Sequence, residues 1–245
     1  MEVEEKAVVV KDLFEGQARL LSDFFARFDI DQIEGFVEKL LECKGLIAFT
    51  GVGKSGLVAK KIAQTMTSTG TRSIFLSPTD ALHGDMGILS SGDCLVILSK
   101  SGESDELLSL IPFVRNKDVT VAALVSNSNS RIAKAVDYPI DIPVEDELCP
   151  FNLAPTISTT AQMIVGDLIA ISLMRMKGVT RDDFAKSHPA GRLGKRMILK
   201  VSDLMVEGDD LPLCPPDSLL GNILPELSDK KCGCMIVVDR GMKMR

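Results

Sequence analysis

The sequence is poor in histidine, in basic patches and in long hydrophobic runs, and the last two shortages each exclude a class of partner. Its 245 residues carry a net charge of −6, without the clustered lysine and arginine that would follow a nucleic-acid backbone. The longest apolar runs fall far short of the roughly 20 residues that a membrane-spanning helix needs. The first residues, MEVEEKAVVV, are acidic where a secretory signal would be basic. We therefore expect neither a nucleic-acid nor a membrane partner.

The six cysteines do not have the spacing of a disulfide framework. Some lie in apolar runs such as DCLVILS, where a reduced cysteine packs as a small hydrophobic side chain. This usage favours a reducing, cytoplasmic compartment. Cys232 and Cys234 resemble half of a metal site, but no second pair accompanies them, so we expect no bound metal.

Short apolar runs alternate with helical stretches along most of the chain. Residues 1–43 contain two segments with apolar side chains at helical spacing, which predicts two N-terminal helices. The alternation that follows predicts an α/β fold, in which a five-stranded parallel sheet is flanked by helices on both faces. Five runs have the length of a buried strand, and they lie near residues 46–51, 72–77, 94–99, 120–126 and 138–143.

A long apolar segment follows the last expected strand. Pro155 suits the first turn of a helix and Gly178 suits its end, so we expect one helix over this range. The polar, glycine-bearing residues 187–200 are typical of a linker or arm. Residues 201–245 begin a second, smaller unit with one clear strand-like run, CMIVVD.

Two strand-to-helix loops, TGVGKSG (residues 50–56) and SKSGESDE (residues 99–106), have the same style. Their glycines allow close approach of a ligand, while serine hydroxyls and the amides of a helix start supply donors. The first loop resembles a nucleotide-binding P-loop, but Ala48 stands where that motif needs glycine. No expected strand ends in a carboxylate suited to hold magnesium. The loops therefore favour a single phosphate, as on a sugar phosphate, over ATP; the alternative is a pair of tight turns.

The titratable candidates are few. His83 and His188 are the two histidines, and both lie in turn-like sequence, ALHGDMG and KSHPAGR. Histidine exchanges protons near neutral pH, although a structural or exposed role is equally consistent with such a position. Glu103 and Glu106 would share one face of a helix start. Glu147 follows the last expected strand. Taken alone, each of these carboxylates is better explained as a solvated side chain.

Five blocks in this order and spacing, over about residues 45–200, resemble the D-arabinose-5-phosphate isomerases. They are GVGKSG, HGDMG, SKSGESDE, LCPFNLAPTISTTAQMIVGD and SHPAGRLGKR. Those enzymes consist of a sugar isomerase (SIS) domain with a flavodoxin-like fold, followed by a pair of CBS modules. The resemblance implies an SIS domain over residues 44–186 and a partial CBS module over residues 201–245. Only the first half of the CBS pair is matched, so a complete adenosyl-ligand site is not expected.

The resemblance also implies a reaction, the interconversion of D-ribulose 5-phosphate and D-arabinose 5-phosphate through a cis-enediol. It implies no cofactor, a product that feeds synthesis of the acidic sugar Kdo, and a homotetramer with shared active sites. Matched position by position, it gives five catalytic residues, Lys54, His83, Glu106, Glu147 and His188. It gives phosphate-binding positions at Ser55, Ser99, Ser101 and Ser104, with Thr159 as a further candidate.

The implied roles differ among the five catalytic residues. His188 is the expected base on carbon, and His83 and Glu147 are the other proton-transfer groups. Lys54 would stabilise charge on the phosphate or the enediolate, and Glu106 would orient its neighbours.

One position departs from the family pattern, and two rival functions stay open. Lys100 stands where bacterial members often carry asparagine, which adds a positive charge beside the phosphate site. A non-catalytic phosphosugar sensor is one rival, but such regulators carry an N-terminal helix-turn-helix, and the first 40 residues here are too short and too acidic for one. An isomerase of another phosphosugar is the second rival, because the shape of the pocket decides the substrate.

Overall fold

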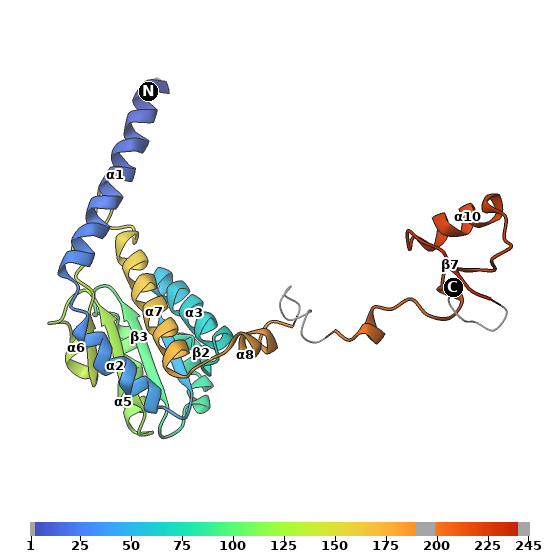
Figure 1. The fold of residues 1–245 in the computed structure, drawn as a ribbon. Coiled ribbons are helices and arrows are strands. Elements are labelled where there is room, and N and C mark those ends of the chain that lie inside the picture. Colours follow the sequence, from blue (N-terminus) through green and yellow to red (C-terminus); the bar gives the residue numbers. More distant parts are fainter. Residues whose placement is uncertain (1–2, 190–198, 240–245) are drawn as a thin grey trace. The chain divides into compact units, whose positions relative to one another are not determined.

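The computed structural model describes residues 3–189 and 199–239, and the chain divides into two compact units, Met1–Pro189 and Ala190–Arg245 (Figure 1). The first, unit 1, contains the predicted sheet and the helices around it. The second, unit 2, is small. Most of the arm predicted at residues 187–200 lies outside the described residues.

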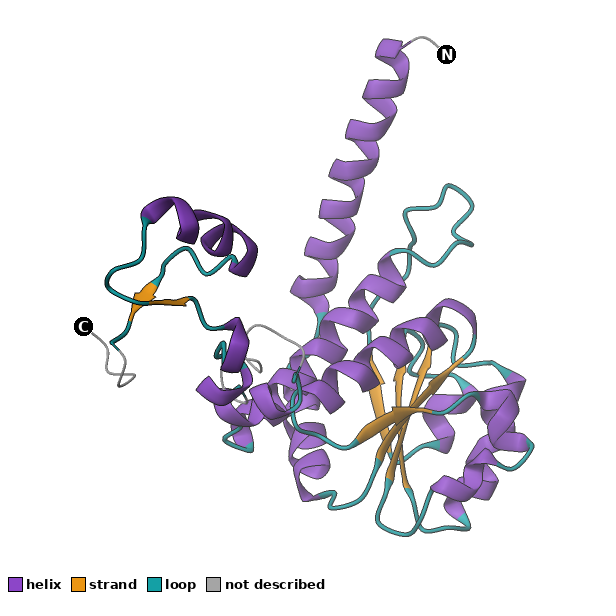
Figure 2. Ribbon diagram, turned by 90° about the vertical axis from the view of Figure 1, so that its right-hand side faces the viewer, coloured by secondary structure: helices purple, strands orange, loops and turns teal. Residues whose placement is uncertain are grey.

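The centre of unit 1 is the predicted five-stranded parallel sheet (Figure 2). Its strand order is β2-β1-β3-β4-β5. Its central strands β1, β3 and β4 are buried along nearly their whole length, because helices cover both faces of the sheet. The strands are β1 (Ile47–Gly51), β2 (Ser73–Phe75), β3 (Cys94–Ser99), β4 (Thr120–Val125) and β5 (Tyr138–Asp141).

Alternate strand residues face two separate cores. On one face Phe49 and Val96 pack with helices α1, α2, α3 and α7, and on the other Ala48 and Ile97 pack with α4, α5 and α6. The helices of the first face are α1 (Val3–Arg27), α2 (Asp31–Glu42), α3 (Gly53–Ser68) and α7 (Ile157–Met176). Those of the second are α4 (Pro78–Leu82), the 3-10 helix η1 (Asp85–Ile88), α5 (Asp105–Arg115) and α6 (Arg131–Ala135); α8 (Arg181–Lys186) follows α7. The two N-terminal helices and the long apolar helix are thus confirmed.

Helix α7 is long and apolar enough to cross a membrane by length and composition, although no uninterrupted apolar run has that length. Half of the stretch is buried inside the unit. Gly166 packs directly against α3, since a Cβ at this position would lie 2.2 Å from Cδ1 of Ile62. Helix α7 therefore has the packing of a core helix.

The two predicted ligand loops leave the same edge of the sheet. The chain leaves β1 toward β2 on one side and returns to β3 on the other, so the switch point of the topology lies between β1 and β3. Gly51 pairs with Leu98 at the carboxyl ends of these strands. Helix α3 begins so close to β1 that a Cβ on Gly56 would lie 2.5 Å from the carbonyl oxygen of Gly51. Glycine at this position therefore allows the sharp turn between β1 and α3.

Unit 2 is a parallel pair of two-residue strands with one helix between them in sequence. Its elements are η2 (Val201–Asp203), η3 (Gly208–Asp210), β6 (Leu213–Cys214), α10 (Leu220–Lys230) and β7 (Ile236–Val237). Within the described part of this unit, α10 has no buried residue, and Leu220 and Leu224 are exposed.

Candidate functional site

The start of helix α3 presents backbone amides at the carboxyl end of β1. Its N-cap residue, Val52, is extended and its side chain makes no capping hydrogen bond. Gly53 opens the helix in the left-handed region at φ 60°. Lys54 is exposed and Ser55 is half-buried on the first turn. Helix N-termini of this kind attract anions, and Lys54 adds a full positive charge.

The loop that follows β3, here called the serine loop (residues 99–105), leaves the strand next to β1 at the same edge of the sheet. Ser99 is buried, and its Oγ accepts a hydrogen bond from Gly102 N at 3.1 Å. Ser101 is exposed and its Oγ accepts from Glu103 N at 3.2 Å. Ser104 is the N-cap residue of α5, but its side chain makes no capping bond. Within the described residues none of these hydroxyls donates a hydrogen bond, so those of the exposed Ser101 and the half-buried Ser104 remain available to a ligand.

Residues 126–132, which follow β4, donate hydrogen bonds to the serine loop. Ser126 N donates to Lys100 O at 2.9 Å, and Ile132 N donates to Gly102 O at 3.0 Å. The Arg131 guanidinium donates to Glu103 Oε2 at 2.5 Å and to Glu103 O at 2.9 Å. Hydrogen bonds to the carboxylate from the Arg131 guanidinium and from Arg131 N hold the pKa of Glu103 below its ordinary value. Glu103 therefore fixes the loop in this structure.

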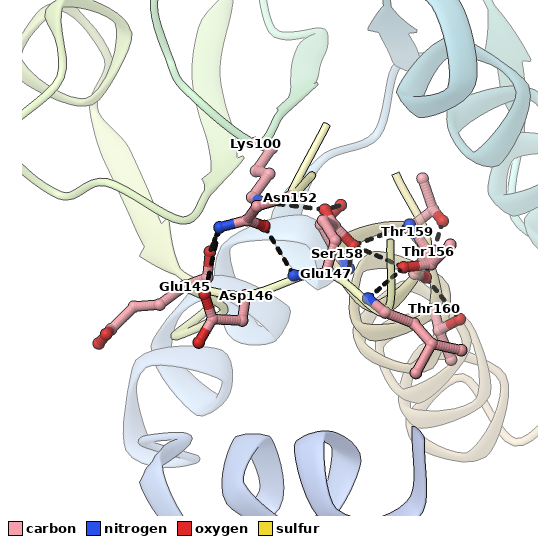
Figure 3. A network of polar contacts seen from close by, with 10 residues as sticks. Lys100, Glu145, Asp146, Glu147, Asn152, Thr156, Ser158, Thr159 and Thr160 are labelled. Atoms are coloured by element: carbon pink, nitrogen blue, oxygen red, sulfur yellow. Dashed lines mark hydrogen bonds and ion pairs between the residues drawn. The ribbon is translucent and has the colours of Figure 1, made fainter. Parts of the chain in front are cut away.

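Glu147 is the most completely bonded side chain at this edge of the sheet (Figure 3). Its side chain is 1% exposed. Oε2 accepts from Thr156 N at 2.8 Å, from Thr156 Oγ1 at 3.0 Å and from Ser158 N at 3.2 Å. Oε1 accepts from Ser158 Oγ and forms an ion pair with Lys100 Nζ at 2.9 Å. Five donors therefore converge on one buried carboxylate.

This environment keeps Glu147 ionised. Burial alone would raise its pKa, but the hydrogen bonds from Ser158, Thr156 and Lys100 outweigh burial and lower the pKa to about 2. A carboxylate of this kind holds its neighbours in place well. It is a weak proton acceptor near neutral pH, where an efficient base has a pKa closer to the working pH.

The residues around Glu147 form a self-bonded segment between β5 and α7. Glu147 N donates to Asn152 Oδ1 at 2.8 Å, and Leu148 N donates to Thr156 Oγ1 at 2.9 Å. Asn152 adopts φ 53°, a left-handed conformation that asparagine tolerates better than most residues. The segment 145–158 is therefore shaped by its own hydrogen bonds as well as by Lys100.

Three further predicted residues lie past carboxyl ends of strands but are not engaged in this way. His83 follows β2 through α4 and is exposed, and Glu106 is exposed on the first turn of α5. Within the described residues, neither side chain makes a hydrogen bond or ion pair, and the same holds for Lys54. Thr159 turns back to its own helix, where its Oγ1 donates to Thr156 O at 3.0 Å.

His188 lies at the other end of the unit. Helix α7 runs from Glu147 toward the amino ends of the strands, about 30 Å for its 20 residues. There Lys177 Nζ donates to Thr71 Oγ1, two residues before β2. Figure 1 shows α8 at that end of α7, and His188 follows α8 by two residues. One chain therefore does not bring His188 to the other candidates.

The ring of His188 is nevertheless well ordered by its surroundings. It stacks on Phe184 with 4.0 Å between ring centroids. Its Nδ1 lies 2.8 Å from the carbonyl oxygen of Phe184. Because a carbonyl only accepts, Nδ1 carries the proton, which leaves Nε2 of the neutral ring able to accept one.

Sequence reasoning missed the partners of Glu147. Lys100 was expected to add a charge beside the phosphate site, and Thr156 and Ser158 were not singled out, yet all three contact the Glu147 carboxylate. The available signal was position, because serine and threonine at a helix start supply hydroxyls to nearby groups.

The described residues contain no group of three or more His, Cys, Asp or Glu side chains arranged to hold a metal ion, and the six cysteines are free.

Comparison with known proteins gives a consistent result. A family model described as SIS domain matches residues 40–172. Two proteins named arabinose 5-phosphate isomerase KdsD, from Yersinia pestis and Pseudomonas aeruginosa, are 40% and 43% identical over 85% and 84% of this chain. The matches span 63% and 64% of those proteins, so the chain covers less than two thirds of their length. The solved structure of Escherichia coli CFT073 c3406 in complex with arabinose 5-phosphate is 32% identical, with a TM-score of 0.73 over 77% of this chain and 100% of that one.

Proposed function

The chain belongs to the SIS domain family, and we propose that it is an aldose-ketose isomerase that interconverts D-ribulose 5-phosphate and D-arabinose 5-phosphate. The observation that carries the proposal is the meeting of two donor-rich elements at the switch point of the sheet. These are the uncapped start of α3 and the serine loop. Such an arrangement suits one phosphate group, and the names of the two KdsD relatives and the sugar-phosphate-bound structure point to a pentose phosphate.

The reaction needs proton movement and no external oxidant. A base takes a proton from C1 of the ketose, the electron pair forms the C1–C2 double bond, and the oxygen on C2 takes a proton. The resulting enediol then loses the proton of the C1 hydroxyl, and C2 receives a proton to give the aldose. Charge develops on oxygen in both steps, where a nearby cation such as Lys54 would stabilise it.

We propose that His188 of the partner subunit supplies the base on carbon, with Nε2 as the accepting atom. Two observations support this assignment. In its own chain His188 follows the end of α7 that is remote from Glu147, and its Nδ1 is already bonded to Phe184. His83 and Glu106 are exposed at the edge where such a residue would arrive. Glu147 would act chiefly by holding the site together.

A shared site requires an assembly, and we propose a homotetramer. Apolar side chains are exposed on α1 and α7, which supply surface for such contacts. They are Val8, Val9, Val10, Leu13, Phe14 and Phe25 on α1, and Met163, Leu168, Ile171 and Met176 on α7. We further propose a cytoplasmic enzyme whose product feeds Kdo synthesis, and a partial CBS module in residues 201–245.

The direct test is incubation with D-ribulose 5-phosphate, with proton NMR detection of the anomeric signal of D-arabinose 5-phosphate. We expect that signal to appear and to be insensitive to EDTA. Binding of the sugar phosphate without turnover would instead support a sensor. Turnover of only a hexose or heptose phosphate would support a different isomerase, and a strict magnesium requirement would contradict the proposed chemistry.

The shared site has its own test. Inactive His188→Ala and Glu147→Ala subunits are mixed, unfolded and refolded together, and we expect partial activity because some mixed sites receive both intact residues. Wild-type protein carried through the same treatment is the control. If every mixture stays inactive while the control recovers, His188 acts within its own subunit or has no role.

A further inference from the structure

Lys100 occupies an unusual place among the predicted phosphate ligands. It lies between Ser99 and Ser101, and the sequence places its charge beside the phosphate site. In the structure its backbone carbonyl accepts from Ser126 N at 2.9 Å, while its ammonium pairs with Glu147 Oε1 at 2.9 Å. The residue therefore connects the serine loop with the segment 145–158, although the two are far apart in sequence (Figure 3).

The five donors to Glu147 are not equivalent. Four come from Thr156 and Ser158, which belong to the same segment and are neutral. Lys100 alone, among the described residues, brings a positive charge and comes from the serine loop. The neighbouring acids are engaged elsewhere, because Glu145 pairs with Arg27 and Asp146 accepts from Asn152.

We propose that Lys100 is a positioning residue whose charge serves Glu147 and not the substrate phosphate. Its ammonium fastens the serine loop to the segment 145–158, so the hydroxyls of the loop and the start of α7 keep a fixed spacing. Because the charge of Lys100 is balanced by a buried carboxylate, the phosphate is held by hydroxyls, amides and Lys54. This inference rests on the proposed function, since the spacing matters for the proposed reaction.

Burial and exposure support separate roles for the two lysines, with Lys100 paired to Glu147 and Lys54 available to the phosphate. The Glu147 side chain is 1% exposed and that of Lys100 is 30% exposed. Moving the ammonium to a phosphate would leave a buried carboxylate without the one charged partner that it has among the described residues, which is strongly unfavourable. Lys54, by contrast, is exposed and makes no hydrogen bond or ion pair among the described residues, so it reaches a phosphate at no such cost.

The test compares Lys100→Met with Lys100→Arg, and uses Lys44→Met as a matched control. Lys44 is an exposed lysine just before β1, at the opposite end of the strands. Three quantities are measured for each variant: kcat and KM for D-ribulose 5-phosphate, the dissociation constant of inorganic phosphate by phosphorus NMR titration, and urea unfolding between pH 3 and pH 7.

We expect Lys100→Met to lower kcat by about 10-fold or more, because the loops lose their fixed spacing. KM and the phosphate dissociation constant should change by less than about threefold, since no phosphate contact is lost. Without its ammonium partner the pKa of Glu147 rises, so stability should fall at a higher pH than in the wild type. Lys100→Arg should recover most of kcat, and Lys44→Met should match the wild type.

Two results would overturn the inference. In the first, Lys100→Met weakens phosphate binding by about 10-fold or more while its acid unfolding is unchanged, which would make Lys100 a phosphate ligand. In the second, Lys100→Met is indistinguishable from Lys44→Met in all three measurements. If the wild type does not isomerise the sugar, the proposed function fails, but phosphate titration and acid unfolding still test the contact with Glu147.

Discussion

The carboxyl edge of the sheet has two regions that are built differently. The fastened region, residues 99–105 and 145–158, is held by ion pairs and by hydrogen bonds that end on Glu147, Glu103 and Lys100. The open region, Lys54, His83 and Glu106, is exposed, and within the described residues its side chains make no hydrogen bond or ion pair. Preorganised donors suit a phosphate that is bound in the same way throughout a reaction, whereas unengaged titratable groups suit proton transfer.

This contrast predicts in which region a substitution changes stability and activity together, and in which it changes activity alone. A substitution in the fastened region should reduce stability and activity together, because the same bonds support both. A substitution in the open region should reduce activity alone. Each prediction below tests this difference between the two regions or measures its size.

The largest effect is expected from Glu147→Gln. The amide presents an NH₂ group to donors that need an acceptor, and it leaves Lys100 without its counterion. Lys100 is 30% exposed, so the loss comes chiefly from the buried donors of Thr156 and Ser158. Leaving such donors unsatisfied costs about 1–3 kcal/mol of unfolding free energy, and we expect activity to be lost with it. Urea unfolding at neutral pH measures the stability change. The control, Glu145→Gln, alters an exposed pair with Arg27 and should be close to neutral.

The stability that Glu147 contributes should also depend on pH in a defined direction. Its folded pKa is about 2, below the ordinary value of 4.5. A depressed folded pKa gives stability that is fully present above the unfolded pKa and is lost as pH falls through the folded pKa. The difference between wild type and Glu147→Gln should therefore be constant above about pH 5 and shrink between pH 4.5 and pH 2. A difference that persists unchanged at low pH would show that ionisation of Glu147 is not its source.

His83→Asn tests the open region. If His83 transfers a proton, kcat should fall by about 100-fold or more. The unfolding free energy should stay within the error of the wild type, because the exposed ring makes no hydrogen bond or ion pair within the described residues. Steady-state kinetics and urea unfolding of the same preparation give both numbers. A clear loss of stability would show that His83 behaves like the fastened region, which would contradict the difference proposed between the two regions.

Much of this edge was predictable from the sequence, because local patterns indicate where strands and loops lie along the chain. Short apolar runs separated by helical stretches predicted the five strands, and glycine-serine loops after β1 and β3 predicted which segments meet at the switch point. These features follow from periodicity and from turn chemistry, which act over a few residues.

The contact between Lys100 and Glu147 was not predictable in the same way. The two residues are far apart in sequence, and their meeting depends on how two irregular segments fold over the sheet. The resemblance suggested only that Lys100, where asparagine is common, adds a positive charge beside the phosphate site, and the structure pairs that charge with a carboxylate from another loop. The position of His188 beyond the far end of α7 likewise depends on the direction in which a whole helix runs.

A smaller effect is expected from the double substitution Ser101→Ala, Ser104→Ala. These hydroxyls hold a phosphate that is remote from the reacting carbons, so their loss weakens ground state and transition state alike. KM should rise more than kcat falls, by about 10-fold for the pair. Phosphorus NMR titration with inorganic phosphate gives an independent reading. Unchanged binding of both phosphate and sugar phosphate would place the phosphate site elsewhere.

The smallest effect is expected from Arg131→Ala, which marks the limit of the fastened region. Arg131 bonds Glu103 Oε2, Glu103 O and Asp105 Oδ1, and it is the one charged side chain of the described residues that braces the serine loop from the segment after β4. All of these contacts are exposed to solvent, which screens them and weakens each one. The loop also keeps two backbone bonds, from Ser126 and Ile132, that the substitution does not touch. KM should therefore rise by only about twofold while kcat stays unchanged. Thermal melting should follow the wild type closely, and Lys134→Ala on the same short helix is the control for lost surface charge. A rise in KM as large as that of the Ser101→Ala, Ser104→Ala variant would contradict this expectation. The exposed guanidinium, and not the backbone hydrogen bonds from Ser126 and Ile132, would then set the shape of the serine loop.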